Sequence, residues 1–282
     1  MDSQRGDAAL CAEPVPLTGS FATGMLRILI LGGTAEAREL AERLAPRADL
    51  EIVVSLAGRT KSPAPQPVPV RSGGFGGVAG LADYLRQERI DALIDATHPY
   101  ANIISANAIA AARQTDVRLI VLRRPPWRAV AGDRWSEATD VADAVRGLGQ
   151  RPRRVFVTLG RTELTPLATA PQHFYLIRSV DPVEPPLPLP RTSYIADRGP
   201  FGAADDRALM TAHAIDAVLA KNSGGAASYG KIEAARALRI EVIMLRRPAP
   251  PNVPAVESVD EAIAWLDHAI ASTIARGTVR GV

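Results

Sequence analysis

The chain has 282 residues, of which 47% are apolar, and a formal net charge of +3 at pH 7. This composition excludes a disordered or fibrous protein and provides enough apolar material for two domains of ordinary size. The one cysteine, Cys11, excludes an internal disulfide framework and argues against a thiolate metal cluster, so we expect a cytoplasmic protein without a bound metal.

The arginines are scattered along the chain without a polybasic tract, which gives little reason to expect a nucleic-acid partner and suits a polyanionic small molecule. The longest apolar runs are the length of strands and fall short of the roughly 20 residues that span a bilayer, so we expect no membrane partner. Residues 1–24 are interpreted as a disordered extension or as a misassigned start upstream of Met25.

Strands and helices alternate from Met25 onward. The apolar run Leu26–Leu31 predicts a buried strand, the stretch 35–45 predicts a helix, and Leu50–Leu56 predicts the next strand. One face of that helix is apolar and consists of Ala37, Leu40, Ala41 and Leu44. The pattern indicates a strand–helix–strand unit with parallel strands.

The same alternation continues through a glycine-rich loop at 71–77. A helix is predicted around 81–87 and a strand at 92–94, and Pro99 fits the first turn of a helix that runs to about Arg113. Short, nearly continuous apolar strands separated by helices indicate an α/β fold with mainly parallel sheets covered on both faces.

Three segments of the first half recur in order in the second. Val117-Arg-Leu-Ile-Val-Leu-Arg-Arg-Pro-Pro126 reappears as Ile240-Glu-Val-Ile-Met-Leu-Arg-Arg-Pro-Ala249, and acidic amphipathic helices are predicted after them, near 136–148 and 258–271. The stretch 27–34 has its counterpart at 154–162. We interpret the chain as two Rossmann-like domains, 25–150 and 151–282, related by internal duplication. The alternative is that buried strands merely resemble one another.

The turn after the first strand reads Gly32, Gly33, Thr34. Two glycines let the backbone approach a pyrophosphate closely, and Thr34 fits the cap of a helix whose N-terminal amides face the anion. The alternative is a plain tight turn. In the duplicate the second glycine is replaced by Arg161, whose guanidinium suits a carboxylate, so the second half is expected to contact the substrate.

The end of the second strand usually meets the adenine ribose of a dinucleotide. Here the chain runs through Ser55 to Arg59 and Lys61 without an acid, which favours NADPH over NADH. The alternative is that Arg59 and Lys61 are solvated loop charges.

Two further loops contrast between the halves. Asp95-Ala-Thr-His-Pro-Tyr100 follows one strand, and Lys221-Asn-Ser-Gly-Gly225 follows its counterpart. We expect both loops to line one cleft, where His98 and Lys221 position the substrate or relay a proton. A structural histidine and a solvated lysine are the alternatives.

Together, these loops and Leu29-Ile-Leu-Gly-Gly-Thr-Ala-Glu-Ala-Arg38 resemble the precorrin-6A reductase family of cobalamin biosynthesis over nearly all of 25–271. The resemblance implies an NADPH-dependent reduction of precorrin-6A to precorrin-6B, with hydride transfer to C19 of the macrocycle. It also implies a polycarboxylate tetrapyrrole as the small-molecule partner of a monomer or small homo-oligomer.

The resemblance assigns residues to the two ligands. The catalytic residues stay unassigned, with His98, Tyr100 and Lys221 as candidates. The implied cofactor set is Gly32, Gly33, Thr34, Ser55, Arg59, Lys61, Gly74, Gly76 and Thr97. The implied substrate set is His98, Tyr100, Arg161, Lys221, Asn222, Ser223 and Gly224.

Three other functions stay open at this point. A related branch of the family acts on the cobalt-containing precursor. A nucleotide-sensing protein would bind the cofactor without oxidising it. An S-adenosylmethionine-dependent methyltransferase would also use a glycine-rich first loop, but it favours an acid at the end of the second strand, which this chain lacks.

Overall fold

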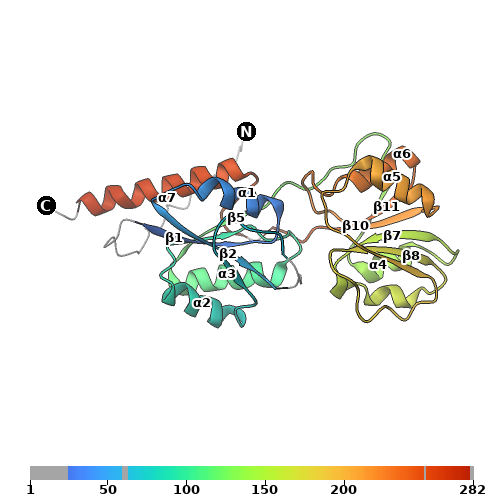
Figure 1. Cartoon of the computed structure of the whole chain (residues 1–282), viewed down its shortest axis with the longest axis horizontal. Helices are drawn as coiled ribbons and strands as arrows, with labels where there is room; N and C mark the ends of the chain where they lie inside the picture. The colour runs from blue at the N-terminus through green and yellow to red at the C-terminus, as the bar shows by residue number, and fades with distance from the viewer. Residues whose placement is uncertain (1–24, 59–62, 251, 280–282) are drawn as a thin grey trace, which may run out of the picture.

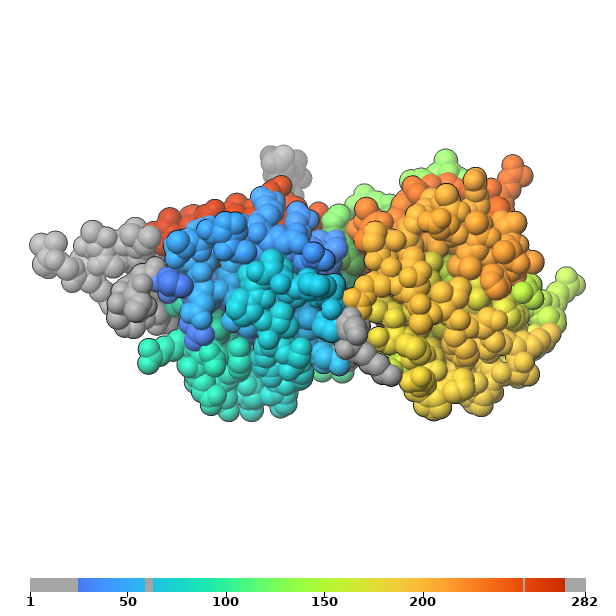
Figure 2. All heavy atoms as spheres, viewed as in Figure 1, coloured from blue at the N-terminus to red at the C-terminus, as the bar shows by residue number. Residues whose placement is uncertain are grey.

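The computed structural model describes residues 25–58, 63–250 and 252–279, with backbone alone for 272–279. These residues form two α/β halves that lie side by side along the long axis of the molecule (Figure 1). In the space-filling view the halves appear as two masses that meet along a narrow boundary (Figure 2).

The first half contains a parallel sheet in the order β12-β5-β4-β1-β2-β3. Its strands are β1 (Leu26–Leu31), β2 (Leu50–Leu56), β3 (Val70–Ser72), β4 (Ala92–Asp95), β5 (Arg118–Leu122) and β12 (Ala255–Val256). Helices α1 (Ala35–Leu44) and α7 (Val259–Val279) cover one face, and α2 (Gly77–Gln87) and α3 (Asn102–Thr115) cover the other. Apolar side chains on both faces of the strands make two cores, as the continuous apolar strands predict.

The second half repeats this plan in the order β6-β11-β10-β7-β8-β9, again parallel. Its strands are β6 (Trp135–Ala138), β7 (Arg154–Thr158), β8 (Phe174–Ser179), β9 (Thr192–Ala196), β10 (Ala217–Lys221) and β11 (Glu241–Leu245). Helix α4 (Val141–Gly147) and the 3₁₀ turn η2 (Thr165–Thr169) pack on one face, and α5 (Ala203–Ala212) and α6 (Gly230–Leu238) on the other. A second 3₁₀ turn, η1 (Arg161–Glu163), follows β7.

Numbered from its own central strand, each sheet has the order 3-2-1-4-5-6, the Rossmann order. The sixth strands are exchanged between the halves. Strand β6 follows β5 in the chain but pairs with β11, and β12 follows β11 but pairs with β5. The shared topology supports the interpretation of the chain as an internal duplication.

This exchange corrects the predicted domain boundary. The predicted boundary lies at residue 150. In the structure the chain crosses to the second half between β5 and β6 and returns between β11 and β12. Helix α4 therefore packs in the second core, and α7 packs against α1 in the first. Sequence periodicity predicts a helix at each of these places, but it does not say which half receives it.

Element ends also differ from the predictions in three places. The helix predicted at 136–148 is strand β6 followed by α4, because the Asp140 side chain caps α4 and accepts a hydrogen bond from Asp143 N at 2.8 Å. Helix α3 begins at Asn102 and not at Pro99, since a turn in which Ala101 N donates to His98 O comes first. Helix α2 begins at Gly77, four residues before the predicted start.

Candidate functional site

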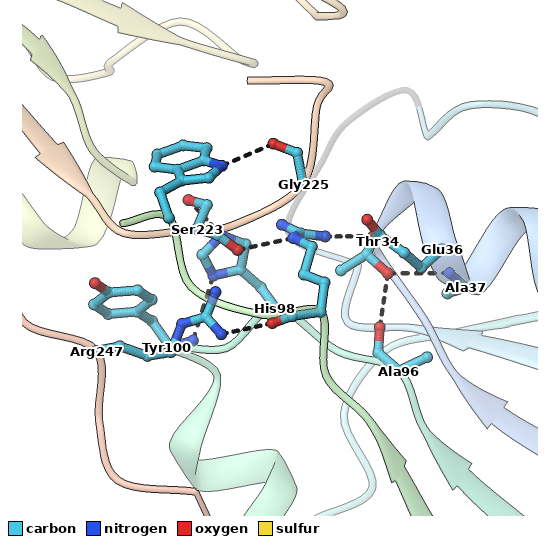
Figure 3. Close-up of polar contacts among 11 residues, drawn as sticks. Thr34, Glu36, Ala37, Ala96, His98, Tyr100, Ser223, Gly225 and Arg247 are labelled. Carbon is cyan, nitrogen blue, oxygen red and sulfur yellow. Dashed lines mark hydrogen bonds and ion pairs between the residues drawn. The ribbon is translucent and has the colours of Figure 1, made fainter. Parts of the chain in front are cut away.

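The turn between β1 and α1 is open to a ligand. Thr34 caps α1 by accepting a hydrogen bond from Ala37 N at 3.1 Å, and its hydroxyl donates to Ala96 O at 2.8 Å (Figure 3). Gly33 has a φ of +111°, and no atom lies within 4 Å of the position that a Cβ would occupy. Free amides at a helix N-terminus beside open space are typical of a phosphate site.

The corresponding turn of the second half is already filled by an acid. Gly160 N donates to Glu163 Oε2 at 3.1 Å, and a Cβ on Gly160 would lie 2.9 Å from the same oxygen. A short 3₁₀ turn follows in place of an α-helix. Arg161, the residue predicted to bind substrate, is exposed at the start of this turn. The second turn therefore has an amide already bound to a carboxylate and lacks the α-helix that the first turn offers an anion.

The glycine-rich loop lies beside the end of β2. Gly73 N donates to Leu56 O at 2.9 Å, and a Cβ on Gly74 or Gly76 would have no atom within 4 Å. The buried Ser55 joins β2 to the first turn, since its carbonyl accepts from Gly32 N at 2.9 Å. The predicted cofactor residues Ser55, Gly74 and Gly76 thus lie at the edge of the first sheet where β2 and β3 end. Arg59 and Lys61 fall outside the described residues.

Asp95 organises the loop after β4. Its Oδ1 accepts hydrogen bonds from Thr97 N at 3.1 Å and from Thr97 Oγ1 at 2.6 Å, and the residue is only 1% exposed. Thr34 bonds to Ala96 in the same loop. The predicted cofactor residue Thr97 is therefore held next to the β1–α1 turn, at the point where the strand order reverses.

His98 reaches across to the second half. Its Nε2 lies 3.1 Å from Ser223 Oγ, and its Nδ1 accepts from Tyr100 N at 3.4 Å. Burial, followed by the positive charges of Arg124, Lys221, Arg247 and Lys231, lowers the pKa of His98 to about 3. A neutral ring that accepts at Nδ1 carries its proton on Nε2, so His98 donates to Ser223. The two loops predicted to share a cleft are in direct contact.

Tyr100 and Lys221 also meet, but each has an internal partner. The Tyr100 hydroxyl donates to Leu245 O at 2.5 Å and accepts from Asn222 N at 2.9 Å, and burial raises the pKa of Tyr100 to about 12. Lys221 Nζ is ion-paired with Glu163 and lies 5.0 Å from the centre of the Tyr100 ring. The Tyr100 hydroxyl thus stays protonated and donates its proton to a hydrogen bond within the protein, whereas Lys221 adds a positive charge near His98.

Asn222 and Gly224 support the loop. Asn222 Oδ1 accepts from Trp127 N at 2.8 Å, and its Nδ2 donates to Trp127 O at 2.9 Å, which ties the loop to the segment crossing from the first half. Gly224 has a φ of +68°, and a Cβ there would lie 2.2 Å from Pro125 O. Both were predicted to contact substrate, but the structure places their groups against the crossing segment.

The predicted site residues do not include Arg124, Glu36 or Arg247, which lie at the junction of the halves. Arg124 donates from Nε to Ser223 O at 2.8 Å and pairs through Nη1 with Glu36 in the first turn of α1. Arg247, its counterpart in the repeat, donates from Nη1 to Arg124 O at 2.6 Å. The duplicated Leu-Arg-Arg-Pro was the signal for both arginines, but it was used only as a mark of duplication.

The described residues contain no group of three or more His, Cys, Asp or Glu side chains that could hold a metal ion. Across the same residues, no helix is long and apolar enough to cross a bilayer.

The comparisons with known proteins agree with one another. The family model described as "Precorrin-6x reductase CbiJ/CobK" matches residues 27–267. A precorrin-6A reductase of Sinorhizobium sp. is 56% identical over 87% of this chain and 94% of its own length. A cobalt-precorrin-6A reductase of Priestia megaterium is 30% identical over 78% and 90%, respectively.

A solved structure described as "CobK precorrin-6A reductase" superimposes with a TM-score of 0.84 at 48% identity, covering 87% of this chain and 97% of the other. The family match covers most of the sequence, and the fold agrees over the same length. The chain is an oxidoreductase that belongs to the precorrin-6x reductase family.

Proposed function

We propose that this protein reduces precorrin-6A to precorrin-6B in cobalamin biosynthesis, with NADPH as the reductant and in the cytoplasm. The observation that carries the proposal is the contrast between the two turns. The turn at Gly33 is open beside the N-terminus of an α-helix, whereas in its duplicate the Gly160 amide is bound to Glu163 and only a 3₁₀ turn follows. One half then holds a dinucleotide, and the other contacts an acidic substrate.

The cofactor fits the first half on physical grounds. Gly33 leaves the place of a Cβ empty, and the Thr34 side chain caps α1 through Ala37 N. In this proposal the pyrophosphate lies on Gly32, Gly33 and Thr34, and the glycine-rich loop at Gly74 and Gly76 runs along the cofactor. Ser55, Arg59 and Lys61 hold the 2′-phosphate end, and Thr97 lies at the switch point.

The substrate side is the junction of the two halves, where the loops after β4 and β10 meet. We assign His98, Lys221, Ser223 and the exposed Arg161 to the surroundings of the macrocycle. Cations there suit a polycarboxylate substrate. Tyr100, Asn222 and Gly224 act behind these residues, because their polar groups or backbone are engaged by the crossing segments.

The sequence identities to known relatives favour precorrin-6A, the cobalt-free substrate. The precorrin-6A reductase of Sinorhizobium sp. is 56% identical to this chain, and the cobalt-precorrin-6A reductase of Priestia megaterium is 30% identical. Assays with cobalt-free and cobalt-bound substrate distinguish the two activities.

The reaction consumes precorrin-6A, NADPH and a proton and yields precorrin-6B and NADP⁺. A bound NADPH would supply the hydride for C19, and a proton from water would complete the saturation of the C18–C19 double bond. The protein's part is to bind and orient the two molecules, which is a large source of catalysis in itself. His98 is neutral at physiological pH because its pKa is about 3, so it orients groups through a hydrogen bond and does not act as a cationic acid.

The test is to mix purified protein, NADPH and precorrin-6A and to follow the nicotinamide absorbance band. We expect loss of the band only when both ligands are present, with precorrin-6B as the product by mass. No oxidation, with NADPH bound, would overturn the reductase proposal in favour of a nucleotide-binding protein. Equal rates with NADH would overturn the choice of cofactor.

A further inference from the structure

We propose that Arg124 is a positioning residue that couples the dinucleotide-binding helix α1 to the loop after β10, so that a bound cofactor favours the substrate-binding arrangement of Ser223 and His98. This inference rests on the proposed function. It concerns a residue outside the cofactor and substrate sets, in the segment that crosses between the halves.

Arg124 bonds to both halves at once. It lies two residues after the end of β5, and its side chain is 14% exposed. Its Nη1 pairs with Glu36 in the first turn of α1, and its Nε donates to Ser223 O at 2.8 Å. These two partners, both labelled in Figure 3, belong to different halves of the molecule. A planar guanidinium with several fixed donors is suited to hold two partners in one geometry.

The contact continues to His98. The Ser223 carbonyl accepts the hydrogen bond from Arg124, and the Ser223 hydroxyl oxygen accepts one from His98 Nε2 at 3.1 Å. The loop also packs on the ion pair, since a Cβ on Gly225 would lie 2.8 Å from Arg124 Cδ and 3.0 Å from Glu36 Oε1. A shift of α1 or of its charge is therefore transmitted to Ser223 through direct contacts.

Charge gives the connection its dependence on the cofactor. Glu36 lies two residues after Thr34, so a pyrophosphate on this turn would be close to its carboxylate. Arg124 neutralises that carboxylate, which an anion arriving at the turn would otherwise meet as a like charge. The bound anion strengthens the field that holds the guanidinium between Glu36 and Ser223.

The repeat provides an internal comparison. Arg247, the counterpart of Arg124, donates to Asn222 O at 3.1 Å and to Arg124 O at 2.6 Å. Its Nη2 is buried without a hydrogen-bond partner among the described residues. Of the two equivalent arginines, Arg124 is the one with a described ion pair to the cofactor-binding half. This asymmetry fits a task specific to Arg124.

The test separates charge neutralisation from positioning. Variants R124Q, R124K, E36Q and E36Q/R124Q are made in the full chain. The dissociation constant of NADPH is measured by calorimetry without substrate, and that of precorrin-6A with and without NADP⁺, which does not turn over. For the wild type we expect precorrin-6A to bind at least about fivefold more tightly when NADP⁺ is present, the lower end of ordinary coupling between sites.

We expect R124Q to bind NADPH about tenfold more weakly, because Glu36 is left unpaired beside the pyrophosphate. The double variant should recover the NADPH affinity, since both charges are gone, but should still lack the effect of NADP⁺ on precorrin-6A. R124K keeps the charge without the two-sided geometry, so it should bind NADPH normally and also lose the coupling.

Two results would overturn the proposal. The first is a wild-type protein whose precorrin-6A affinity does not change with NADP⁺. The second is a double variant that retains the wild-type coupling, which would leave Arg124 with charge neutralisation only. If R124Q does not fold, R124K and E36Q/R124Q decide the question. Failure of the reductase function itself is separate, because it shows as absence of NADPH oxidation by the wild type.

The matched control is the ion pair of Arg38 and Glu42 on the same helix. These side chains are 47% and 48% exposed and pair at 2.9 Å within α1. E42Q removes a carboxylate from α1 as E36Q does, and exposed pairs contribute little to stability. We expect E42Q to change neither the NADPH affinity nor the coupling.

Discussion

At the scale of single residues, the phosphate turn depends on the backbone of Gly33. Its φ of +111° is unfavourable for any side chain, and the space around the missing Cβ is open. We expect G33A to cost about 1 kcal/mol of folding free energy and, in addition, to weaken NADPH binding at least about tenfold by blocking the pyrophosphate. Calorimetry and urea unfolding measure the two effects.

Gly149 is the control for this change, since it has a φ of +77° and equally open surroundings after α4. G149A imposes similar backbone strain and should leave NADPH affinity unchanged. If both variants bind NADPH as the wild type does, the turn at Gly33 is not the pyrophosphate site.

Arg59 carries the proposed choice of NADPH over NADH, on the basis of its position after the second strand. Loss of a cation beside the 2′-phosphate removes an interaction that NADH never makes. We therefore expect R59A to raise the KM for NADPH about tenfold or more and to leave the KM for NADH nearly unchanged. Steady-state kinetics with both cofactors measure this, and an unaltered KM for NADPH would remove Arg59 from the site.

His98 makes stability depend on pH. Burial first, and then the neighbouring cations, lower its native pKa to about 3, against 6.5 as its ordinary value. Between these values the unfolded chain binds a proton that the native protein does not, so the native state loses stability as the pH falls below 6.5. From pH 6.5 to 5 this amounts to about 2 kcal/mol.

In H98N this contribution is absent, and its unfolding free energy should fall less steeply from pH 7 to 5 than that of the wild type. Urea denaturation at several pH values measures the slopes. Parallel slopes would mean that His98 titrates normally in the folded protein.

At the scale of elements, the loop after β10 owes its path to Gly224. Its φ of +68° and a Cβ position 2.2 Å from Pro125 O leave no room for a side chain. We expect G224A to displace Ser223 and to raise the KM for precorrin-6A several-fold, while the dissociation constant of NADPH stays nearly the same. A227S, at an exposed position of the same loop, is the control. An equal loss for both ligands would show a general loss of folding.

The elements that the sequence predicted best are those in which periodicity and a cap agree. The bounds of β1 and β2 were predicted correctly, as was the apolar face of α1. In each element the apolar residues follow one regular pattern, and a turn or the Thr34 cap marks where the pattern stops or begins. Strand β6 was read as helix, since its four residues are too few for periodicity and an acidic helix follows at once.

The candidate site was likewise predicted in part. The loops after β4 and β10 were found because chemically reactive residues directly follow apolar strands, and parallel strands bring their ends to one edge. The partners of those residues were not found. Lys221 pairs with Glu163 from the turn after β7, Asn222 bonds to Trp127 in the crossing segment, and Arg124 pairs with Glu36 of α1. Each contact joins residues far apart in the chain, which no local pattern encodes.

At the scale of the whole molecule, the exchange makes each half depend on a strand and helix from elsewhere in the chain. The first half, which is proposed to bind NADPH, receives β12 and α7 from the C-terminal part. A cut at residue 150 would leave the first sheet without these elements and would remove β6 and α4 from the second. The two halves are therefore expected to depend on each other for folding.

Leu266 on α7 tests this dependence. It is fully buried in the core formed by β1, α1 and β2, so L266A leaves a cavity in the NADPH-binding half. We expect a loss of about 2 to 5 kcal/mol in the free energy of unfolding, measured by urea denaturation, and partial recovery when NADPH is added because the ligand binds only the folded half. H268A, at an exposed position two residues later, should have little effect. Equal stability of L266A and the wild type, or no response of the variant to NADPH, would contradict the placement of this helix in the cofactor-binding half.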